Sequence, residues 1–422
     1  MSLEQLDRRV LWHPFTQQAE WNPLVIERGE GVYLIDSEGR RYIDGVGSLW
    51  CNLHGHRHPR LDRALHQQVD RLSHSTFLGL THEPGVRLAV ALLEVVPAGL
   101  ARVFYSDSGS TAVEIALKQS FQFWQLRGRR SKQRFLRLGD AYHGDTLGAV
   151  GVGGIDIFHR IFGPLLVRSI AVPSPSGTNG AASLHRLEAE LDQRSDEIAA
   201  LVMEPLVQGA AGMLVHPEGF LRQAAALCRE FGVHLIADEV ATGFGRTGAM
   251  FACEHEGVSP DFLCLAKGIA GGYLPLAATV TTEEIYSEFL GRREDMRHFF
   301  HGHTFTGNPL ACAVGIESLA LLRESTLANA MKRSRELGSI LDRFRKHPSV
   351  KSVRNCGLMI GIELDPKPGR FMGVEACDRA RAHGAILRPL GDVIVWMPPL
   401  TITQQEVEKL ASATMNAIDD CR

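Results

Sequence analysis

The stretch VHLIADEVATGFGRTG, residues 233–248, contains a short apolar run that ends in the carboxylates Asp238 and Glu239. A second apolar run, FLCLAKG at residues 262–268, ends in Lys267. Short apolar runs of this kind are typical of strands buried inside a parallel sheet. Ligands of open α/β sheets bind beyond the carboxyl ends of the strands. The sequence therefore predicts that Asp238 and Lys267 lie at a ligand-binding edge.

These two residue types suit one cofactor. A carboxylate beneath a pyridinium nitrogen, with a lysine that bonds covalently to an aldehyde, is what pyridoxal phosphate (PLP) chemistry requires. Asp238 is expected to keep the ring nitrogen protonated, and Lys267 to tether the cofactor and later move a proton. Taken singly, Asp238 could be a helix cap and Lys267 a solvated lysine. Their joint placement at two strand ends favours the cofactor site.

A phosphate site is predicted at residues 106–111 (SDSGST), where a strand gives way to a helix. Small residues let the backbone approach an oxyanion, and a helix N-terminus offers free N–H groups and the positive end of its dipole. The alternative is an ordinary capped turn, since Thr111 and Glu114 also fit a capping box. Asp238 and Lys267 downstream favour phosphate.

The pattern along the chain predicts an α/β fold. Strands expected at 102–105, 133–138, 199–203 and 233–237 alternate with helices at 86–96, 111–126 and 219–231. This alternation indicates a mostly parallel sheet with helices on both faces.

The two ends of the chain do not show the alternation of strands and helices that marks its middle part. Residues 1–50 predict an arm and a short sheet with a hairpin turn at 37–40, belonging to the smaller domain. Beyond 320 the pattern is that of a compact α+β domain. The expected elements are helices at 311–323, 326–346 and 374–383, antiparallel strands at 350–354 and 358–364, strands at 386–389 and 393–397, and a last helix capped by Thr403. We therefore expect a large PLP-binding domain at 51–320 and a small domain at 321–422.

Composition narrows the class of function. The 422 residues include 45 basic and 48 acidic side chains, a net charge of −3, which gives no reason to expect nucleic acid or a membrane as partner. The basic run at 127–132 reads as a solvated loop. No apolar stretch predicts a signal peptide or a membrane span. Eight scattered cysteines without a CxxC pair fit a reducing compartment, so a cytoplasmic protein is expected.

A metal site is not expected. In HGHRHP, residues 54–59, three histidines alternate, but Gly55 and Pro59 favour a loop and no carboxylate or cysteine completes a ligand set. Trp12, Phe123 and Trp124 are expected to serve as packing.

The span 235–248, joined to the strand that ends at Lys267, resembles the class III, or omega, aminotransferases of PLP fold type I. Further stretches resemble members of that family that convert 8-amino-7-oxononanoate to 7,8-diaminononanoate in biotin biosynthesis. They are LWHPFTQ at 11–17, YHGDT at 142–146, FACEH at 251–255 and HGHTFTGNP at 301–309. The resemblance runs from about residue 11 to 399. It implies a PLP enzyme that acts on a small amino donor and a keto acid, as a homodimer with shared active sites.

The resemblance also implies residue roles. Lys267 would hold the cofactor and Asp238 would pair with its ring nitrogen. The further cofactor contacts would be Gly109, Ser110, Tyr142, His303 and Thr304, with Thr304 supplied by the neighbouring subunit. The substrate wall would comprise Phe15, Leu49, Trp50, Tyr142, Gly302 and Arg388, with Arg388 binding the carboxylate of the keto acid. Glu204 and Gln208 would stand beside the ring.

Two positions depart from the better-known pattern of those members. Phe15 stands where a tyrosine is usual, and Leu49-Trp50 where two tryptophans are usual. Phe15 lacks a hydroxyl, and Leu49 lacks an aromatic face that could stack on an adenosyl group or its sulfonium. The amino donor, S-adenosylmethionine or lysine, is therefore left open.

Other functions remain as alternatives. One is another omega-aminotransferase acting on ornithine, γ-aminobutyrate or a diamine, and a second is a PLP aminomutase. A binding protein without activity would not need both Asp238 and Lys267.

Overall fold

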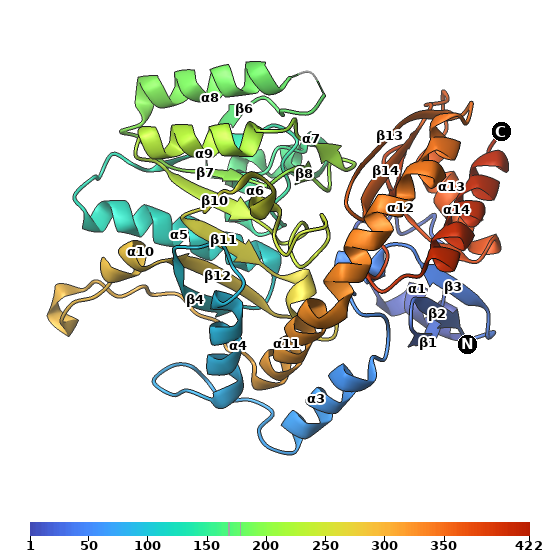
Figure 1. The fold of residues 1–422 in the computed structure, drawn as a ribbon, viewed down its shortest axis with the longest axis horizontal. Coiled ribbons are helices and arrows are strands. Elements are labelled where there is room, and N and C mark those ends of the chain that lie inside the picture. The colour runs from blue at the N-terminus through green and yellow to red at the C-terminus, as the bar shows by residue number, and fades with distance from the viewer. Residues whose placement is uncertain (168, 178) are drawn as a thin grey trace.

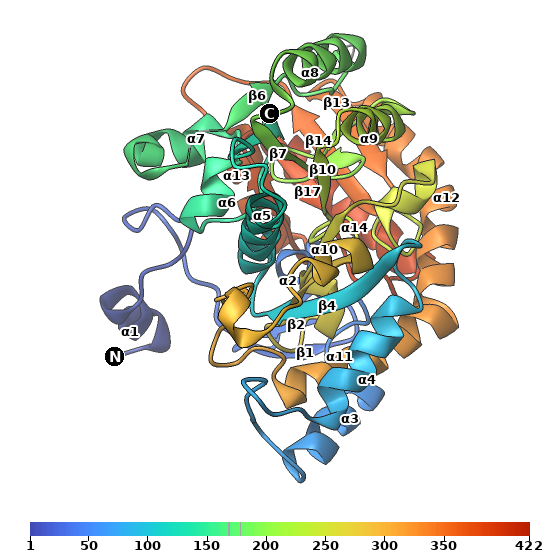
Figure 2. The ribbon, with the colours of Figure 1, turned by 90° about the vertical axis from the view of Figure 1, so that its left-hand side faces the viewer.

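The computed structural model describes residues 1–167, 169–177 and 179–422. Figure 1 shows a large lobe built around one sheet and a smaller lobe that carries the C-terminus, with the N-terminal strands beside it. Figure 2 shows the same arrangement from the side of the large lobe, with the N-terminal helix standing apart from it. Among the described residues no helix is long and apolar enough to cross a membrane.

The large lobe contains a seven-stranded sheet. Its order is β4 (Leu100–Ser106), β12 (Ala277–Thr282), β11 (Phe262–Leu265), β10 (His234–Asp238), β7 (Ile198–Met203), β5 (Arg134–Leu138) and β6 (Ile170–Val172). The strands from β11 to β6 are parallel, whereas β12 is antiparallel to both of its neighbours. The predicted α/β fold with a mostly parallel sheet is confirmed.

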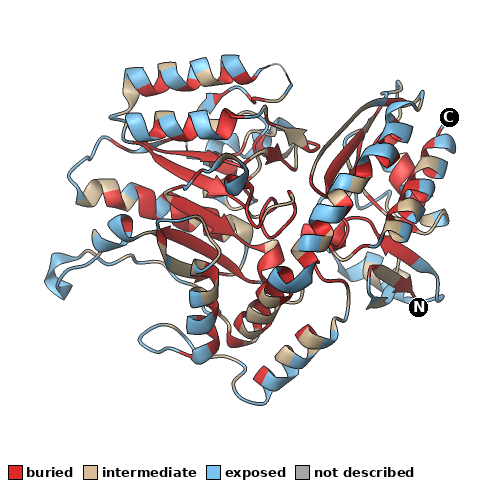
Figure 3. Cartoon of the chain, in the orientation of Figure 1, coloured by how far each residue is buried: buried red, intermediate tan, exposed pale blue. Residues whose placement is uncertain are grey.

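Both faces of this sheet are covered. Ile236 and Phe262 point to one face, where they pack with α5 (Gly109–Leu126). Leu235 and Leu263, their neighbours along the strands, point to the other face and join the main core. Figure 3 shows the central strands almost wholly buried. Burial on both faces explains why these strands read as continuous apolar runs.

The helices up to residue 321 lie partly in the N-terminal segment, where the first stands apart and the second is a short left-handed turn, and otherwise in the large lobe and the stretch that leads into the small one. They are α1 (Leu3–Val10), α2 (Gly47–Trp50), α3 (Pro59–Val69), α4 (Glu83–Leu93), α6 (Leu147–Gly151), α7 (Asp156–His159), α8 (Gly180–Arg194), α9 (Phe220–Glu230), α10 (Glu283–Ser287) and α11 (Pro309–Leu321). A two-stranded hairpin joins β8 (Val207–Gln208) to β9 (Leu214–Val215).

The small lobe has a four-stranded antiparallel sheet. Its strands are β13 (Val350–Cys356), β14 (Met359–Leu364), β17 (Val393–Trp396) and β16 (Arg388–Leu390), with α12 (Leu327–Arg345), α13 (Met372–Ala382) and α14 (Gln404–Asp419). A further sheet joins β1 (Ile26–Glu30), β2 (Tyr33–Asp36) and β3 (Arg41–Asp44) to β15 (Ala385–Ile386). The predicted hairpin turn at 37–40 and the Thr403 cap are confirmed. The division at residues 50 and 320 stays a prediction.

Two predicted elements differ in the structure. The strand expected at 386–389 is divided between two sheets, because Ile386 pairs with β3 whereas Arg388 pairs with β17. The helices expected at 311–323 and 326–346 are joined without a loop through a π-helical turn at Leu322–Thr326. In that turn the hydroxyl oxygen of Thr326 forms a hydrogen bond with Nδ1 of His54, 3.0 Å away.

The solvated loop predicted at 127–132 is wrong at Lys132. This side chain is 5% exposed, and its Nζ donates to the carbonyl oxygens of Ser195, Ile198 and Gly232 at 2.7–2.9 Å. It also lies 4.5 Å from the centroid of the Trp124 ring. The packing predicted for Trp124 and Phe123 is confirmed by their edge-to-face contact. Trp12, by contrast, is 90% exposed within the single chain, so its predicted packing role is wrong there.

Candidate active site

Asp238 and Lys267 line the same cavity, which has a volume of about 460 Å³. Asp238 is the last residue of β10, and it pairs in register with Cys264 of β11. Lys267 follows the end of β11 by two residues. Because the two strands are parallel neighbours, their carboxyl ends deliver both side chains to one edge of the sheet. Gly109, Ser110, Tyr142 and Trp50 line the cavity too.

The amine of Lys267 lies in an environment that disfavours its charge. Burial lowers its pKa to about 8, although the nearby carboxylates of Asp238 and Glu204 act in the opposite direction. Its Nζ lies 4.5 Å from the centroid of the Trp50 ring. A lower pKa increases the fraction of neutral amine, which is the nucleophilic form. Lys267 also has a φ of 43°, a sparsely populated region that often marks functional sites.

Both oxygens of the Asp238 carboxylate have partners. Oδ2 lies 2.7 Å from Nδ1 of His143, and Oδ1 accepts from the N–H of Val240 at 3.0 Å. The other imidazole nitrogen of His143, Nε2, is buried and has no hydrogen-bond partner among the described residues. Sequence reasoning assigned His143 no role. The sequence feature that could have indicated a role for His143 is its position in the stretch YHGDT, directly after Tyr142.

The first turn of α5 lies at the cavity wall. Ser108 is the N-cap, and its Oγ accepts from the N–H of Thr111 at 3.3 Å. A capped turn, the alternative reading of this stretch, is present, but its capping box joins Ser108 to Thr111 and not Thr111 to Glu114, because the helix begins at Gly109. The carboxylate of Glu114 instead accepts from the N–H of Gly148 at 2.7 Å, at the start of α6. The free N–H groups of the first turn of α5 are available to an anion in the cavity.

Glu204 also lines the cavity. Its Oε2 accepts from the N–H of Tyr142 at 3.1 Å, and its Oε1 accepts from the N–H of Gly209 at 2.9 Å. Burial raises the pKa of this carboxyl to about 7. Tyr142 donates its hydroxyl to Asp145 at 2.8 Å. Gln208 is buried elsewhere, where it contacts Ser174 and Gly139 and does not line the cavity.

Trp50 reaches the cavity from a left-handed turn. Ser48, Leu49 and Trp50 have φ values of 47°, 71° and 73°. Left-handed residues cost roughly 1–2 kcal/mol each unless they are glycine. Trp50 is nonetheless 5% exposed and lines the cavity, whereas Leu49 is 46% exposed and does not. Strain of this kind persists only where the surrounding structure enforces it.

Arg388 and Phe15 lie near the cavity but are not among its lining residues. The Arg388 guanidinium is 5.5 Å from the centroid of the Phe15 ring, and its Nε is buried without a hydrogen-bond partner among the residues described. Burial lowers the pKa of Arg388. Phe15 contacts Phe158 edge-on, and Phe158 contacts Tyr142 in the same way. Aromatic contacts thus connect Phe15 to the cavity wall.

Gly302, His303 and Thr304 lie elsewhere in the single chain. They line a second cavity of about 1170 Å³, and Gly302 and Thr304 are exposed. His303 is connected to the first cavity through its Nδ1, which lies 2.7 Å from the carboxylate of Asp107. Within one chain the structure therefore does not bring these residues to Lys267.

The three histidines of residues 54–58 have separate partners. His54 contacts Thr326 and Ser318, His56 contacts Asp44 and Asn52, and His58 caps α3. Over residues 1–167, 169–177 and 179–422, the structure contains no group of three His, Cys, Asp or Glu side chains placed to hold a metal ion.

The residues of the first cavity fit PLP. A buried amine, a buried carboxylate and a helix N-terminus surround one space, and His143 Nε2 is a buried polar atom left without a partner there. These groups match the aldehyde, the ring nitrogen and the phosphate of that cofactor.

Comparison with known proteins agrees with this chemistry. Residues 15–418 match the family described as aminotransferase class-III. Adenosylmethionine-8-amino-7-oxononanoate aminotransferase from Geobacter sulfurreducens is 49% identical, over 99% of this chain and 97% of that protein. The crystal structure of the Methanocaldococcus jannaschii protein of that name has a TM-score of 0.96 at 40% identity, covering 99% of this chain and 98% of that one.

A solved amine transaminase is similar as well. It comes from an uncultivated Pseudomonas species, was determined in a PLP-bound form, and has a TM-score of 0.92 at 35% identity over 98% of this chain and 99% of that one. The chain belongs to the class III aminotransferases, which are PLP-dependent transferases.

Proposed function

We propose that this chain transfers an amino group to 8-amino-7-oxononanoate, giving 7,8-diaminononanoate in biotin biosynthesis. The proposed donor is S-adenosylmethionine, with lysine as the alternative. One observation carries the proposal: Lys267 and Asp238 line a single cavity in a chain that is 49% identical, over nearly its full length, to a protein named for this reaction.

PLP bound in the cavity would supply an electron sink and a carrier for the amino group. Lys267 is proposed to take the proton from the donor carbon at its Nζ and to return a proton to the carbon of the keto acid. Its lowered pKa, about 8, suits an amine that must both accept and release a proton near neutral pH.

Asp238 is proposed to keep a proton on the ring nitrogen of PLP, which would face its carboxylate when the cofactor is bound. His143 and Val240 fix both of its oxygens, so the carboxylate cannot rotate away. Gly109 and Ser110, at the start of α5, would hold the phosphate through backbone N–H groups. Trp50 and Tyr142 would shield the reacting amine from water.

Arg388 is proposed to bind the carboxylate of the keto acid. The support is its half-buried guanidinium, whose Nε has no partner within the described part of the chain. A planar guanidinium matches a carboxylate in two parallel hydrogen bonds, which an ammonium cannot reproduce. Arg388→Lys should therefore raise the KM for the keto acid while cofactor binding stays unchanged.

We also propose a cytoplasmic homodimer with shared active sites. Gly302 and Thr304 are exposed and do not line the cavity of their own chain, as expected of residues that serve a neighbour. In this arrangement Thr304 of one subunit contacts the phosphate bound by the other, and a monomer is inactive.

The donor is tested by mixing the purified PLP form with S-adenosylmethionine and, separately, with lysine. The true donor bleaches the visible band of the bound cofactor and supports amination of 8-amino-7-oxononanoate. The similarity to an amine transaminase favours one alternative, an omega-aminotransferase with another substrate. If neither amine reacts while ornithine, γ-aminobutyrate or a diamine does, the biotin assignment fails. Turnover on a single amino compound without a second substrate would indicate an aminomutase.

A further inference from the structure

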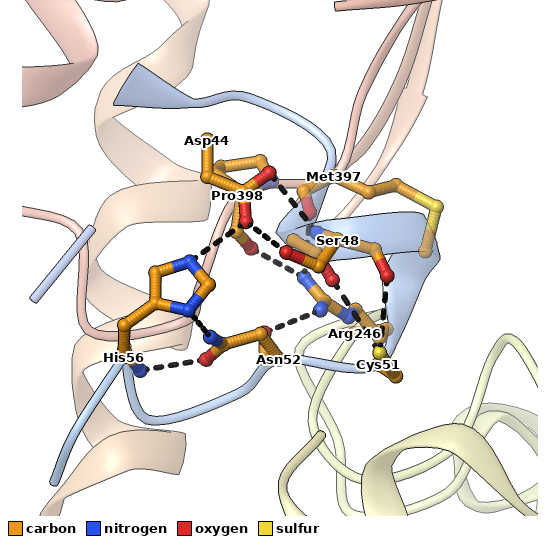
Figure 4. A network of polar contacts seen from close by, with 10 residues as sticks. Asp44, Ser48, Cys51, Asn52, His56, Arg246, Met397 and Pro398 are labelled. Carbon is orange, nitrogen blue, oxygen red and sulfur yellow. Dashed lines mark hydrogen bonds and ion pairs between the residues drawn. The ribbon is translucent and has the colours of Figure 1, made fainter. Parts of the chain in front are cut away.

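Arg246 is a buried cation held by backbone carbonyls. It is 1% exposed, and its Nη2 donates to the carbonyl oxygens of Asn52 at 2.9 Å and Trp50 at 3.3 Å. Its Nη1 donates to the carbonyl oxygens of Met397, at 3.2 Å, and Pro398. Figure 4 shows the guanidinium between the N-terminal segment and the end of β17. Among the described residues no carboxylate forms an ion pair with it.

This guanidinium joins three parts of the chain that are far apart in sequence. Arg246 belongs to the loop after β10, Trp50 to the left-handed turn, and Met397 to the small lobe. The backbone of Arg246 is fixed as well, because its carbonyl accepts from the N–H of Leu358 at 2.9 Å. A Cβ at Gly357 would lie 2.3 Å from that carbonyl oxygen, so the contact leaves no space.

The left-handed turn is held from its other side by a second set of contacts. Asp44 accepts from the N–H and the hydroxyl of Ser48 at 3.0 and 2.7 Å, and it lies 3.0 Å from Nε2 of His56. His56 in turn contacts the side-chain Nδ2 of Asn52, and the backbone carbonyl oxygen of Asn52 accepts from Arg246. Figure 4 shows the two sets meeting at Asn52.

Arginine suits this position better than lysine. Its guanidinium carries several donors in a rigid fork, so that one side chain can bind several carbonyls in fixed directions. Burial lowers the pKa of Arg246 to about 10, which still leaves it charged at neutral pH. The position is therefore one where a charge is kept away from water in order to hold backbone in place.

We propose that Arg246 is a positioning residue for Lys267: it clamps the left-handed turn Gly47–Trp50, and the clamped turn sets the Trp50 ring 4.5 Å from the Lys267 amine. The effect of Arg246 on catalysis rests on the proposed function, but its effect on the backbone conformation of residues 47–50 does not. Loss of the clamp lets the turn relax towards right-handed or extended backbone, which withdraws the ring and admits water to the amine.

Cys51 reports on the turn without any need for cofactor or substrate. Its thiol contacts the carbonyl oxygen of Ser48, 3.2 Å away, inside the turn, and it is half-buried. The test measures the rate at which a thiol reagent labels Cys51 in the apo protein, with the labelled peptide identified by mass spectrometry. The variants are Arg246→Met and Arg246→Lys.

Lys132→Met is the matched control. Lys132 is also a buried cation bound by backbone carbonyls, but it lies on the loop before β5, among Ser195, Ile198 and Gly232. Both Met variants are expected to lower the melting temperature. Only Arg246→Met is expected to accelerate Cys51 labelling, by about tenfold or more, because only there does the turn open locally. Arg246→Lys should restore part of the protection.

In the loaded enzyme, Arg246→Met should lower kcat and move the acidic limb of the pH profile to higher pH, since water restores the ordinary pKa of Lys267 and the amine must be neutral to take the proton. Equal Cys51 labelling in wild type and Arg246→Met, with equal pH profiles, overturns the proposal. If Arg246→Met does not fold, Gly47→Ala replaces it, because a Cβ there meets Met397 O at 2.8 Å and Arg246 Nη2 at 3.1 Å. Wild-type protein that protects Cys51 but does not aminate the keto acid contradicts the proposed function alone.

Discussion

Nδ1 of His143 lies 2.7 Å from Oδ2 of Asp238, and both side chains are buried. The histidine comes from the loop after β5 and the aspartate from the end of β10, so the contact joins two segments at the same edge of the sheet. With the N–H of Val240 on the other oxygen, the carboxylate has a single orientation. A group that must face a cofactor nitrogen gains from being fixed in advance.

His143→Phe should lower kcat by about 10²-fold, because a misdirected catalytic group commonly costs that much. The ring is retained, so the fold should survive. His159→Phe is the control, since His159 stacks near Tyr142 and has no partner on either nitrogen among the described residues. Steady-state kinetics decide, and wild-type kcat in His143→Phe would refute the orienting role.

Lys267→Ala should abolish the visible band of bound cofactor and lower kcat by about 10⁴-fold, the upper end of what proton transfer contributes. The exposed Lys409→Ala should change neither quantity. Absorption spectra of the two proteins after incubation with PLP, together with turnover, provide the measurement. A retained band in Lys267→Ala would show that another amine carries the cofactor.

Glu204 should make stability fall as pH rises. Burial raises its pKa from an ordinary 4.5 to about 7, so the folded protein holds this proton more tightly than the unfolded chain. The free energy of unfolding therefore decreases between these two values, where the folded state binds more protons. In Glu204→Gln this contribution is missing, so relative to wild type the variant should gain about 2 kcal/mol from about pH 5 to about pH 8.

Urea unfolding of the apo protein at fixed concentration measures this trend. The control is Glu283→Gln, an exposed carboxylate paired with Arg102, whose pKa is lowered by that partner and which stays ionised throughout. A parallel pH dependence of wild type and Glu204→Gln would contradict the expectation. Glu204→Gln also loses one hydrogen bond, from Tyr142 or Gly209, at every pH. The comparison therefore uses how the free energy of unfolding changes with pH and not its absolute value.

Leu49→Trp should favour S-adenosylmethionine as donor. An aromatic face near a sulfonium contributes on the order of 0.5–2 kcal/mol, so kcat/KM for that donor should rise about three- to thirtyfold. Leu49 is 46% exposed, so an indole at this position has room. The KM for the keto acid is the internal control. An unchanged or lower preference for S-adenosylmethionine over lysine would show that residue 49 does not contact the bound donor.

Mixed dimers should reveal whether Thr304 acts across subunits. Lys267→Ala and Thr304→Ala are each prepared as homodimers and then exchanged. A hybrid contains one site with an intact Lys267 from one chain and an intact Thr304 from the other, so mixing should restore activity at low PLP. Activity that never exceeds that of Thr304→Ala alone would mean that Thr304 serves its own chain.

The strand ends and their chemistry were readable from sequence because the information is local. Asp238 and Lys267 each end an apolar run, and the turn before α5 is rich in small residues. His143, Arg246 and Lys132 were missed or misread for the opposite reason. Each owes its role to partners brought together only by folding, such as Trp50 and Met397 around Arg246.

Helix starts and sheet switches were the other errors. The helix expected at 111–126 begins at Gly109 and is capped by Ser108, because Ser108 and Thr111 both fit the local pattern of an N-cap. The segment at 386–389 was predicted as one strand, since nothing in its composition marks the step at Leu387 from one sheet to the next.

Phe15 and Leu49 lie within the first fifty residues and Arg388 in the last forty, while Asp238 and Lys267 occupy the middle of the chain. If these terminal residues have the substrate roles that the family resemblance implies, recombination between relatives exchanges those substrate contacts while Asp238 and Lys267 are inherited intact. A lineage that diverges in this way can acquire new substrates without rebuilding its chemistry. The clamp at Arg246 sets the limit, because any exchanged N-terminal segment must still offer it the carbonyls of residues 50 and 52.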